Sequence, residues 1–209
     1  MEGIILSSQL AGKSSFARSC LPTEAQINLH VDGQAFYALV HLMEPDENLL
    51  EILAEAAHEV FCAHLKANGY RYGPETSEAE KIHSSLKDYN QLSNNEKEQN
   101  RNNVRDIPRK LAMIGYTMVP VRGNKSAAEF SDDETAVLAR MEHERWMQEK
   151  LDAGWKFAEK TDKSKKRHKG LIPWEELSRE ETDKDYLMVQ SISQILARAG
   201  YTVAKLSKT

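Results

Sequence analysis

Histidines stand at matched positions in two stretches of the chain, and imidazole is well suited to bind a metal or to move a proton near neutral pH. His58 and His83 lie in the first stretch, and His143 and His168 lie 85 positions later. If these rings converge, they form a metal or acid–base site. The pair His143-Glu144 lacks the second histidine, four positions on, that a helical zinc motif requires. The sequence therefore favours a structural role, in which His58 and His143 hydrogen-bond the segment after them, and we expect neither a metal nor a cofactor.

Nucleophilic catalysis has no recognisable machinery in this sequence. No serine stands on a glycine-flanked elbow, no cysteine is shared by the two stretches, and the phosphate-cradling Walker pattern is missing. We expect a protein that is not an enzyme, with a metal-dependent hydrolase as the alternative. We expect a cytoplasmic protein with no membrane contact.

Charge is distributed unequally between the two stretches. Residues 160–169 contain six basic side chains against Asp162, whereas the matched residues 75–84 contain three glutamates against Lys81. A charge run of this kind is usually a solvated face, here neutralised by the acidic residues 175–185. The alternatives are a phosphate-bearing ligand, and nucleic acid or another charged partner. Because the whole chain has a formal net charge of −4, double-stranded nucleic acid is disfavoured and nucleic acid is not an expected partner.

Aromatic side chains follow a glycine in both stretches, as Tyr70 and Tyr72 in the first and Trp155 and Phe157 in the second. These rings are mostly core residues, but one of each pair can cover a cleft between the two stretches. An aromatic face beside a cation suits a flat base with an attached phosphate. The candidate ligand-binding residues are Tyr70, Tyr72, Lys81, His83, Arg101, Arg145, Trp146, Trp155, Phe157, Lys166, His168 and Trp174.

An internal repeat explains these matches, because residues 53–117 align with residues 138–202 without a gap. Each unit predicts a first helix, a long polar connection and a second helix. The domains predicted from it are an N-terminal extension over 1–45, a first repeat over 46–120, a linker over 121–130 and a second repeat over 131–205. In the extension, residues 27–31 suggest a strand.

Helix boundaries can be read from caps and glycines. The first helix runs from Asp46 to Gly69 in one repeat and from Ser131 to Gly154 in the other. The second helix starts at a capping box in both repeats, formed by Ser93 with Glu96 and by Ser178 with Glu181, and ends at Gly115 or Gly200. Only the first repeat has a proline, Pro108, inside this helix, which predicts a kink there alone.

Two amphipathic helices cannot bury both apolar faces alone, so the repeats should pack on each other. We expect a mainly α fold in which the helical pairs are related by a pseudo-two-fold axis, with short strands and a small N-terminal extension.

Several ordered motifs of the two units resemble the ryanodine-receptor repeat, or RyR domain. They include His143-Glu-Arg-Trp146, Gly154-Trp155-x-Phe157, Lys166-x-His168-x-x-Leu171-x-Pro-Trp174 and, in the first unit, Gly69-Tyr70-x-Tyr72 and Lys81-x-His83. The resemblance implies a helical module that is used in tandem in large intracellular calcium-release channels and occurs in soluble bacterial proteins. It also implies regulation, including loop phosphorylation and contact with adenine nucleotides.

The function predicted is a non-catalytic regulatory or sensor module that binds a small anionic ligand, such as a nucleotide, in a cleft between the repeats. The alternative is a structural or protein-interaction module whose charged loops mediate docking or self-association, with a protein partner or a homo-oligomer.

Overall fold

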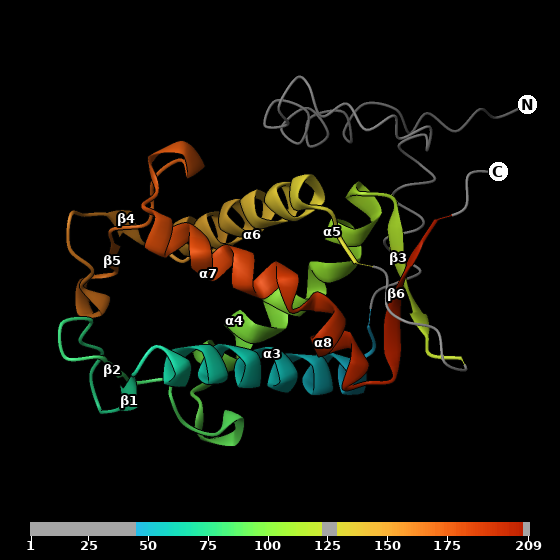
Figure 1. The fold of residues 1–209 in the computed structure, drawn as a ribbon. Coiled ribbons are helices and arrows are strands. Elements are labelled where there is room, and N and C mark those ends of the chain that lie inside the picture. The colour runs from blue at the N-terminus through green and yellow to red at the C-terminus, as the bar shows by residue number, and fades with distance from the viewer. Residues whose placement is uncertain (1–44, 123–128, 207–209) are drawn as a thin grey trace, which may run out of the picture.

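The first helix of each repeat is its longest element in the computed structural model, which describes residues 45–122 and 129–206. These helices are α3 (Glu47–Ala67) and α6 (Asp132–Asp152) (Figure 1). The expected strand at 27–31 lies outside the described residues. Asp46 caps α3 by accepting a hydrogen bond from the Leu49 amide at 2.8 Å, because its carboxylate satisfies a first-turn N–H that has no helical partner.

Both first helices start and end where the sequence predicts. The Ser131 hydroxyl accepts from the Glu134 amide at 3.2 Å, and the Glu134 carboxylate accepts from the Ser131 amide at 2.8 Å, which completes a capping box. Gly69 and Gly154 follow the helix ends with φ of +80° and +79°. Only glycine adopts this left-handed conformation without a steric cost, so each glycine ends its helix.

Each connection contains a short parallel ladder; the sequence analysis expected short strands but predicted neither the position nor the pairing of these. In the first repeat β1 (Arg71–Tyr72) pairs with β2 (Ile82–His83), and in the second β4 (Lys156–Phe157) pairs with β5 (Arg167–His168). Three 3-10 turns complete the connections: η1 (Tyr89–Gln91), η2 (Lys163–Lys165) and η3 (Trp174–Glu176).

The second helix is broken in both repeats. It forms α4 (Asn94–Arg105) and α5 (Ile107–Met113) in the first, and α7 (Arg179–Gln190) and α8 (Ile192–Ala197) in the second. The breaks fall at the matched positions Asp106 and Ser191, so the prediction of a kink in the first repeat alone was wrong. Pro108 sits in the first turn of α5, where a missing N–H costs little, and is not the cause of the break. The break instead accompanies packing of α5 and α8 on the strands that follow them.

The predicted capping box at the start of the second helix forms in only one repeat. The Ser93 hydroxyl accepts from the Glu96 amide at 3.3 Å, and Glu96 accepts from the Ser93 amide at 2.9 Å. The Ser178 hydroxyl instead donates to the Glu181 carboxylate at 3.3 Å and makes no capping bond. The prediction for Ser178 was therefore wrong: its hydroxyl contacts the Glu181 side chain but accepts no hydrogen bond from a first-turn amide.

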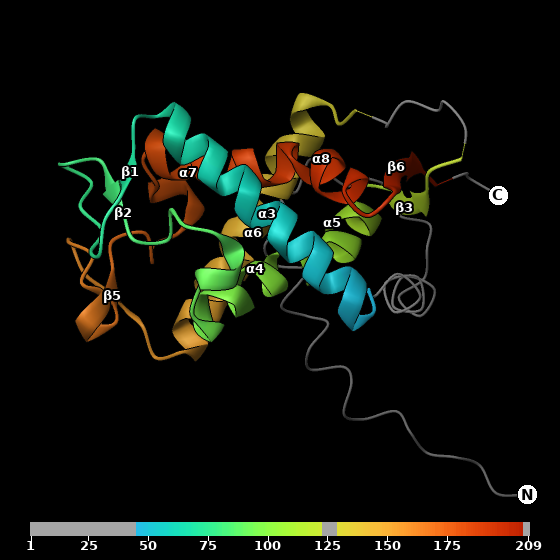
Figure 2. The same cartoon turned by 90° about the horizontal axis from the view of Figure 1, so that it is seen from below.

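An antiparallel pair of strands joins the two repeats. These strands are β3 (Tyr116–Pro120) and β6 (Tyr201–Lys205), and Met118 pairs with Val203, its match 85 positions later (Figures 1 and 2). The neighbouring pairs, Thr117 with Ala204 and Val119 with Thr202, are also exchanged by this offset. The two strands therefore meet through equivalent residues.

One hydrophobic core serves both repeats. It includes Leu53 and Leu111 from the first repeat, and Leu138, Ile195 and Leu196 from the second, all 1% exposed or less. Helix α3 contacts α7 and α8 of the other repeat. The fold is mainly α, and within the described ranges every helix is too short or too polar to cross a bilayer.

A buried polar network also links the repeats. Lys110 of α5 is 1% exposed, and its Nζ lies 2.6 Å from Glu142 Oε2 of α6 and 3.1 Å from Asp106 Oδ2. Asn103 donates to the other Glu142 oxygen at 2.8 Å. Burial raises the pKa of Glu142, but Lys110 and Arg145 outweigh burial and lower it to about 2. The carboxylate is therefore charged inside the interface.

Candidate ligand-binding site between the repeats

The first aromatic of each pair folds back against a histidine. In the first repeat the ring of His83 lies 5.3 Å from Phe61 and 6.5 Å from Tyr70, edge to face. In the second repeat the ring of His168 lies 4.8 Å from Trp146 and 6.3 Å from Trp155. Each connection therefore covers its own first helix with a packed aromatic–histidine cluster.

His83 and His168 are neutral at pH 7. Burial, together with a nearby lysine, Lys163 for His83 and Lys150 for His168, lowers the pKa of each to about 4. The Nδ1 atoms accept from the amides of Ser85 at 3.2 Å and of residue 170 at 3.0 Å, which leaves the proton on Nε2. These rings can donate one hydrogen bond but carry no charge.

His58 and His143 hold the connections in place, as the sequence predicts. Nε2 of His58 lies 2.7 Å from the Lys87 carbonyl oxygen, and Nε2 of His143 lies 2.8 Å from that of Ile172. His143 Nδ1 also faces Asp185 at 3.6 Å. No group of three or more metal-ligating side chains occurs in the part of the chain that the structure describes.

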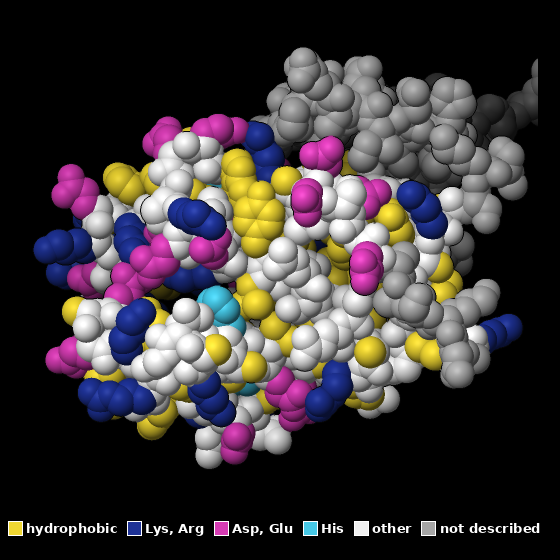
Figure 3. All heavy atoms as spheres, viewed as in Figure 1, with side chains coloured by type: hydrophobic (Ala, Val, Ile, Leu, Met, Phe, Trp, Pro, Cys, Tyr) yellow, Lys and Arg dark blue, Asp and Glu magenta, His cyan; other side chains and the backbone are white. Residues whose placement is uncertain are grey.

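The two connections touch each other. Lys163 Nζ donates to Thr76 Oγ1 at 3.2 Å and to Ser84 Oγ at 3.4 Å, and Lys169 Nζ lies 3.0 Å from Glu78 Oε2. The basic segment of the second repeat therefore lies against the acidic segment of the first, and their opposite charges meet at the contact. This end of the molecule carries Lys and Arg side chains beside Asp and Glu (Figure 3).

Lys150 is a buried cation with only neutral partners. The residue is 8% exposed, its Nζ donates to Gln99 Oε1 of the other repeat at 2.9 Å, and it lies 5.0 Å from the centre of the Trp155 ring. Among the described residues, no carboxylate lies within ion-pair distance of it, whereas the buried Lys110 has two. Burial lowers the pKa of Lys150; Glu149 opposes this shift, and Lys163 adds to it. The matched residue of the first repeat is Leu65, so the sequence comparison of the repeats gave no signal for this site.

The candidate residues do not gather in one pocket. We call the contact between the two connections, where Lys163 meets Thr76 and Lys169 meets Glu78, the seam. The candidate residues of the aromatic–histidine clusters lie at the seam or beside it: Tyr70, His83, Trp146, Trp155 and His168. Lys81 lies 4.8 Å from the centre of the Tyr70 ring, and Lys166 Nζ donates to the Ala153 carbonyl oxygen at 2.9 Å. Tyr72 and Phe157 are 57% and 52% exposed and cover no cleft.

The remaining candidates are held by neighbours in the fold. Arg101 pairs with Glu51 and with Glu98, and Trp174 packs against His143 and Tyr186. Arg145 pairs with Glu142 at 2.8 Å and with Glu149 at 2.6 Å.

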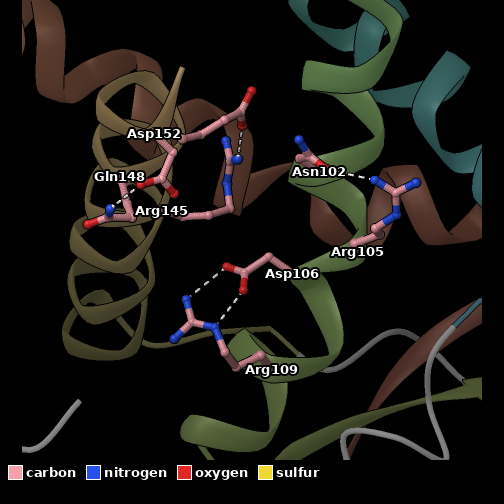
Figure 4. A pocket seen from close by; sticks show the side chains of 8 residues that line it. Asn102, Arg105, Asp106, Arg109, Arg145, Gln148 and Asp152 are labelled. Carbon is pink, nitrogen blue, oxygen red and sulfur yellow. Dashed lines mark hydrogen bonds and ion pairs between the residues drawn. The ribbon is translucent and has the colours of Figure 1, made fainter. Parts of the chain in front are cut away.

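A groove of about 490 Å³ lies between the repeats on the side of Arg145 (Figure 4). Helices α4 and α5 and the break between them contribute Asn102, Arg105, Asp106 and Arg109, and α6 contributes Arg145, Gln148, Glu149 and Asp152. Arg109 and Asp106 are joined by two hydrogen bonds, and Arg105 donates to Asn102 at 2.6 Å. The charged side chains of this groove are already paired with one another, so the groove is a weaker candidate site for an anionic ligand than the surroundings of Lys150. Sequence reasoning identified only Arg145 among its residues.

A second cavity, of about 500 Å³, lies within the first repeat and contains a cysteine next to a histidine. Cys62 Sγ lies 3.3 Å from Nε2 of His58, four residues earlier on α3, a spacing that the sequence analysis overlooked. Nε2 also faces the Lys87 carbonyl oxygen, so it holds a proton and cannot accept one from the thiol. Burial raises the pKa of Cys62. The pair is therefore not an activated nucleophile.

Comparison with known proteins identifies the family. No curated protein matches the chain. The model of the RyR domain matches residues 37–120 and again residues 129–205, which together make up more than half of the chain and contain both helical units described above. The chain therefore belongs to the RyR domain family and carries two tandem copies of the domain.

Proposed function

We propose that this chain is a non-catalytic regulatory or sensor module that binds a small anionic ligand, such as a nucleotide, at the seam between the repeats. The two repeats act as one body about a pseudo-two-fold axis that passes near the Met118–Val203 pair. The connections of both repeats form the seam, so a ligand that binds there contacts both repeats.

The observation that carries the proposal is the environment of Lys150. A buried ammonium without a carboxylate partner is costly, because burial removes its water and nothing of opposite charge replaces it. An anionic ligand supplies that charge. Trp155 offers an aromatic face beside the ammonium, and Gln99, Thr76 and Ser84 supply polar groups from the other repeat. This combination suits a flat base with a phosphate.

Thermal-shift measurement and calorimetry with a panel of nucleotides and inorganic phosphate test the proposal. A ligand at about 100 times its dissociation constant stabilises the folded state by about 2.7 kcal/mol. We expect Lys150→Met to abolish the shift. Lys97→Met is the matched control, because Lys97 also lies over a ring, 5.3 Å from the centre of Tyr89, away from the connection seam.

The absence of any shift at millimolar concentration of every ligand contradicts the proposal. If the protein then forms an oligomer that dissociates when salt is added, the alternative of docking through charged loops is favoured.

A further inference from the structure

The ladder of β4 and β5 presents two cations side by side on the outside of the second repeat. Lys156 and Arg167 are register partners, both are exposed, and adjacent strands lie about 4.8 Å apart. Like charges directly opposite each other destabilise a strand pair. Neither side chain forms an ion pair with any residue that the structure describes, and the same holds for Lys160. The ladder thus lacks a counter-charge of its own.

An exposed aromatic ring belongs to the same ladder. Phe157 follows Lys156 on the same strand, so its ring points to the opposite face of the ladder from Lys156 and Arg167, and it is 52% exposed. The first repeat differs at the equivalent ladder, where Arg71 pairs with Ile82 and only one cation is present. The combination of two unpaired cations and a solvent-facing ring is therefore specific to the second repeat.

From these exposed groups we propose that the β4–β5 ladder binds single-stranded nucleic acid that passes round the edge of β4, with Phe157 stacking on a base on one face and Lys156 and Arg167 contacting phosphates on the other. Proteins that bind single strands without sequence preference combine these two elements, a basic track and aromatic stacking platforms. The net charge of the whole chain disfavours a duplex, but the segment 156–169 carries seven basic residues against Glu159 and Asp162. A local basic track is sufficient for a flexible strand.

The neighbouring acidic segment explains why a single strand fits better than a duplex or a bilayer. Lys169 contacts Glu78 and Lys163 contacts Thr76, so the segment that contains three glutamates lies next to the basic one. A rigid or flat polyanion that covers this end meets both segments and is repelled by one. A flexible strand can follow the basic segment alone. An acidic peptide supplies charge but no base to stack on Phe157.

Fluorescence anisotropy with a labelled oligothymidine of about 20 nucleotides tests this proposal at low salt. We expect binding that weakens as salt rises. Phe157→Ala reduces affinity by about 5- to 150-fold, the range that corresponds to stacking of one base, and Phe157→Trp retains it. The double variant Lys156→Gln and Arg167→Gln reduces the salt slope by about 1.4, the value for two phosphate contacts on a single strand.

Arg71→Gln is the matched control, because it removes the equivalent cation of the first repeat, and we expect it to leave binding unchanged. The proposal is overturned if the oligonucleotide fails to bind at protein concentrations up to about 100 μM at low salt, or if Phe157→Ala binds like the parent chain. It is also overturned if polyglutamate or anionic vesicles bind as tightly as the oligonucleotide. The proposal does not rest on the Lys150 site, because Phe157 lies outside it.

Discussion

The Lys110 ammonium lies 2.6 Å from the Glu142 carboxylate, and this pair crosses the interface between the two repeats while almost completely buried. Glu142 also accepts hydrogen bonds from Asn103 and Arg145. The ion pair is therefore one part of a larger buried network of polar side chains. Removing Lys110 takes one of the two cations away from the buried Glu142 carboxylate and leaves Arg145 as its remaining counter-charge. The pair therefore makes the folding of each repeat depend on the other.

Lys110→Met is expected to lower the free energy of unfolding by about 3 to 5 kcal/mol, the usual cost of removing one partner of a buried ion pair. Urea denaturation followed by circular dichroism measures it. Arg105→Met is the control, because its side chain is 45% exposed and its ion pair with Glu98 contributes at most about 1 kcal/mol. Similar losses in both variants would show that burial of the Lys110 pair has no special role.

Lys150→Met, in contrast to Lys110→Met, is expected to change the stability little in the absence of ligand. The variant removes a buried charge that has no carboxylate partner, but it also leaves the Gln99 amide without its donor. These two effects offset each other, so we expect the free energy of unfolding to stay within about 1 kcal/mol of the parent chain. Urea denaturation beside Lys110→Met tests the contrast. A loss as large as that of Lys110→Met would mean that Lys150 is structural.

Much of the helical framework follows from local rules that the sequence displays directly. Gly69 and Gly154 end the first helices, and Ser131 with Glu134 caps α6, since these choices depend on residues a few positions apart. The Met118–Val203 pairing depends on how two repeats meet, and no local pattern encodes it. The ladders β1–β2 and β4–β5 have two residues per strand, too short for an alternating pattern.

The candidate site, too, could be predicted only in part from local sequence patterns. The aromatic and histidine matches between repeats identified residues that pack within each repeat, such as His168 against Trp146. Lys150 was missed because its match is Leu65, and a search for shared residues passes over a position where the repeats differ. Its importance appears only when burial and the partner Gln99, 51 positions away in sequence, are known.

Acid is expected to destabilise the protein through His83 and His168. The pKa of each is lowered to about 4 in the folded state and is about 6.5 when unfolded, so the unfolded state binds more protons between these values. The stabilisation is present above about pH 6.5 and is lost as the pH falls towards 4. At pH 5 the two histidines together take up about two protons on unfolding.

Unfolding experiments between pH 4 and 7 measure this uptake as the slope of stability against pH. Replacing either His83 or His168 with Gln should reduce the slope by about one proton, and the double replacement by about two. His64→Gln is the control, because His64 is partly exposed in the last turn of α3 and, among the residues that the structure describes, forms a side-chain hydrogen bond with Asn68 alone. An unchanged slope in the double variant would show that these rings are not buried as neutral groups.

Asp185→Asn is expected to lower the pKa of His143. Burial lowers the pKa of this imidazole, but hydrogen bonds to Asp185 and to the Ile172 carbonyl oxygen outweigh burial and raise it overall. Without the carboxylate, burial dominates and the protonated ring loses its counter-charge. Nuclear magnetic resonance titration of the histidine ring protons follows the change. His83 is the internal control, because Asp185 is not among the groups that shift its pKa, so its ring signals should follow the same titration in the variant. If the pKa of His143 is unchanged in Asp185→Asn, the contact at 3.6 Å does not stabilise the charged ring.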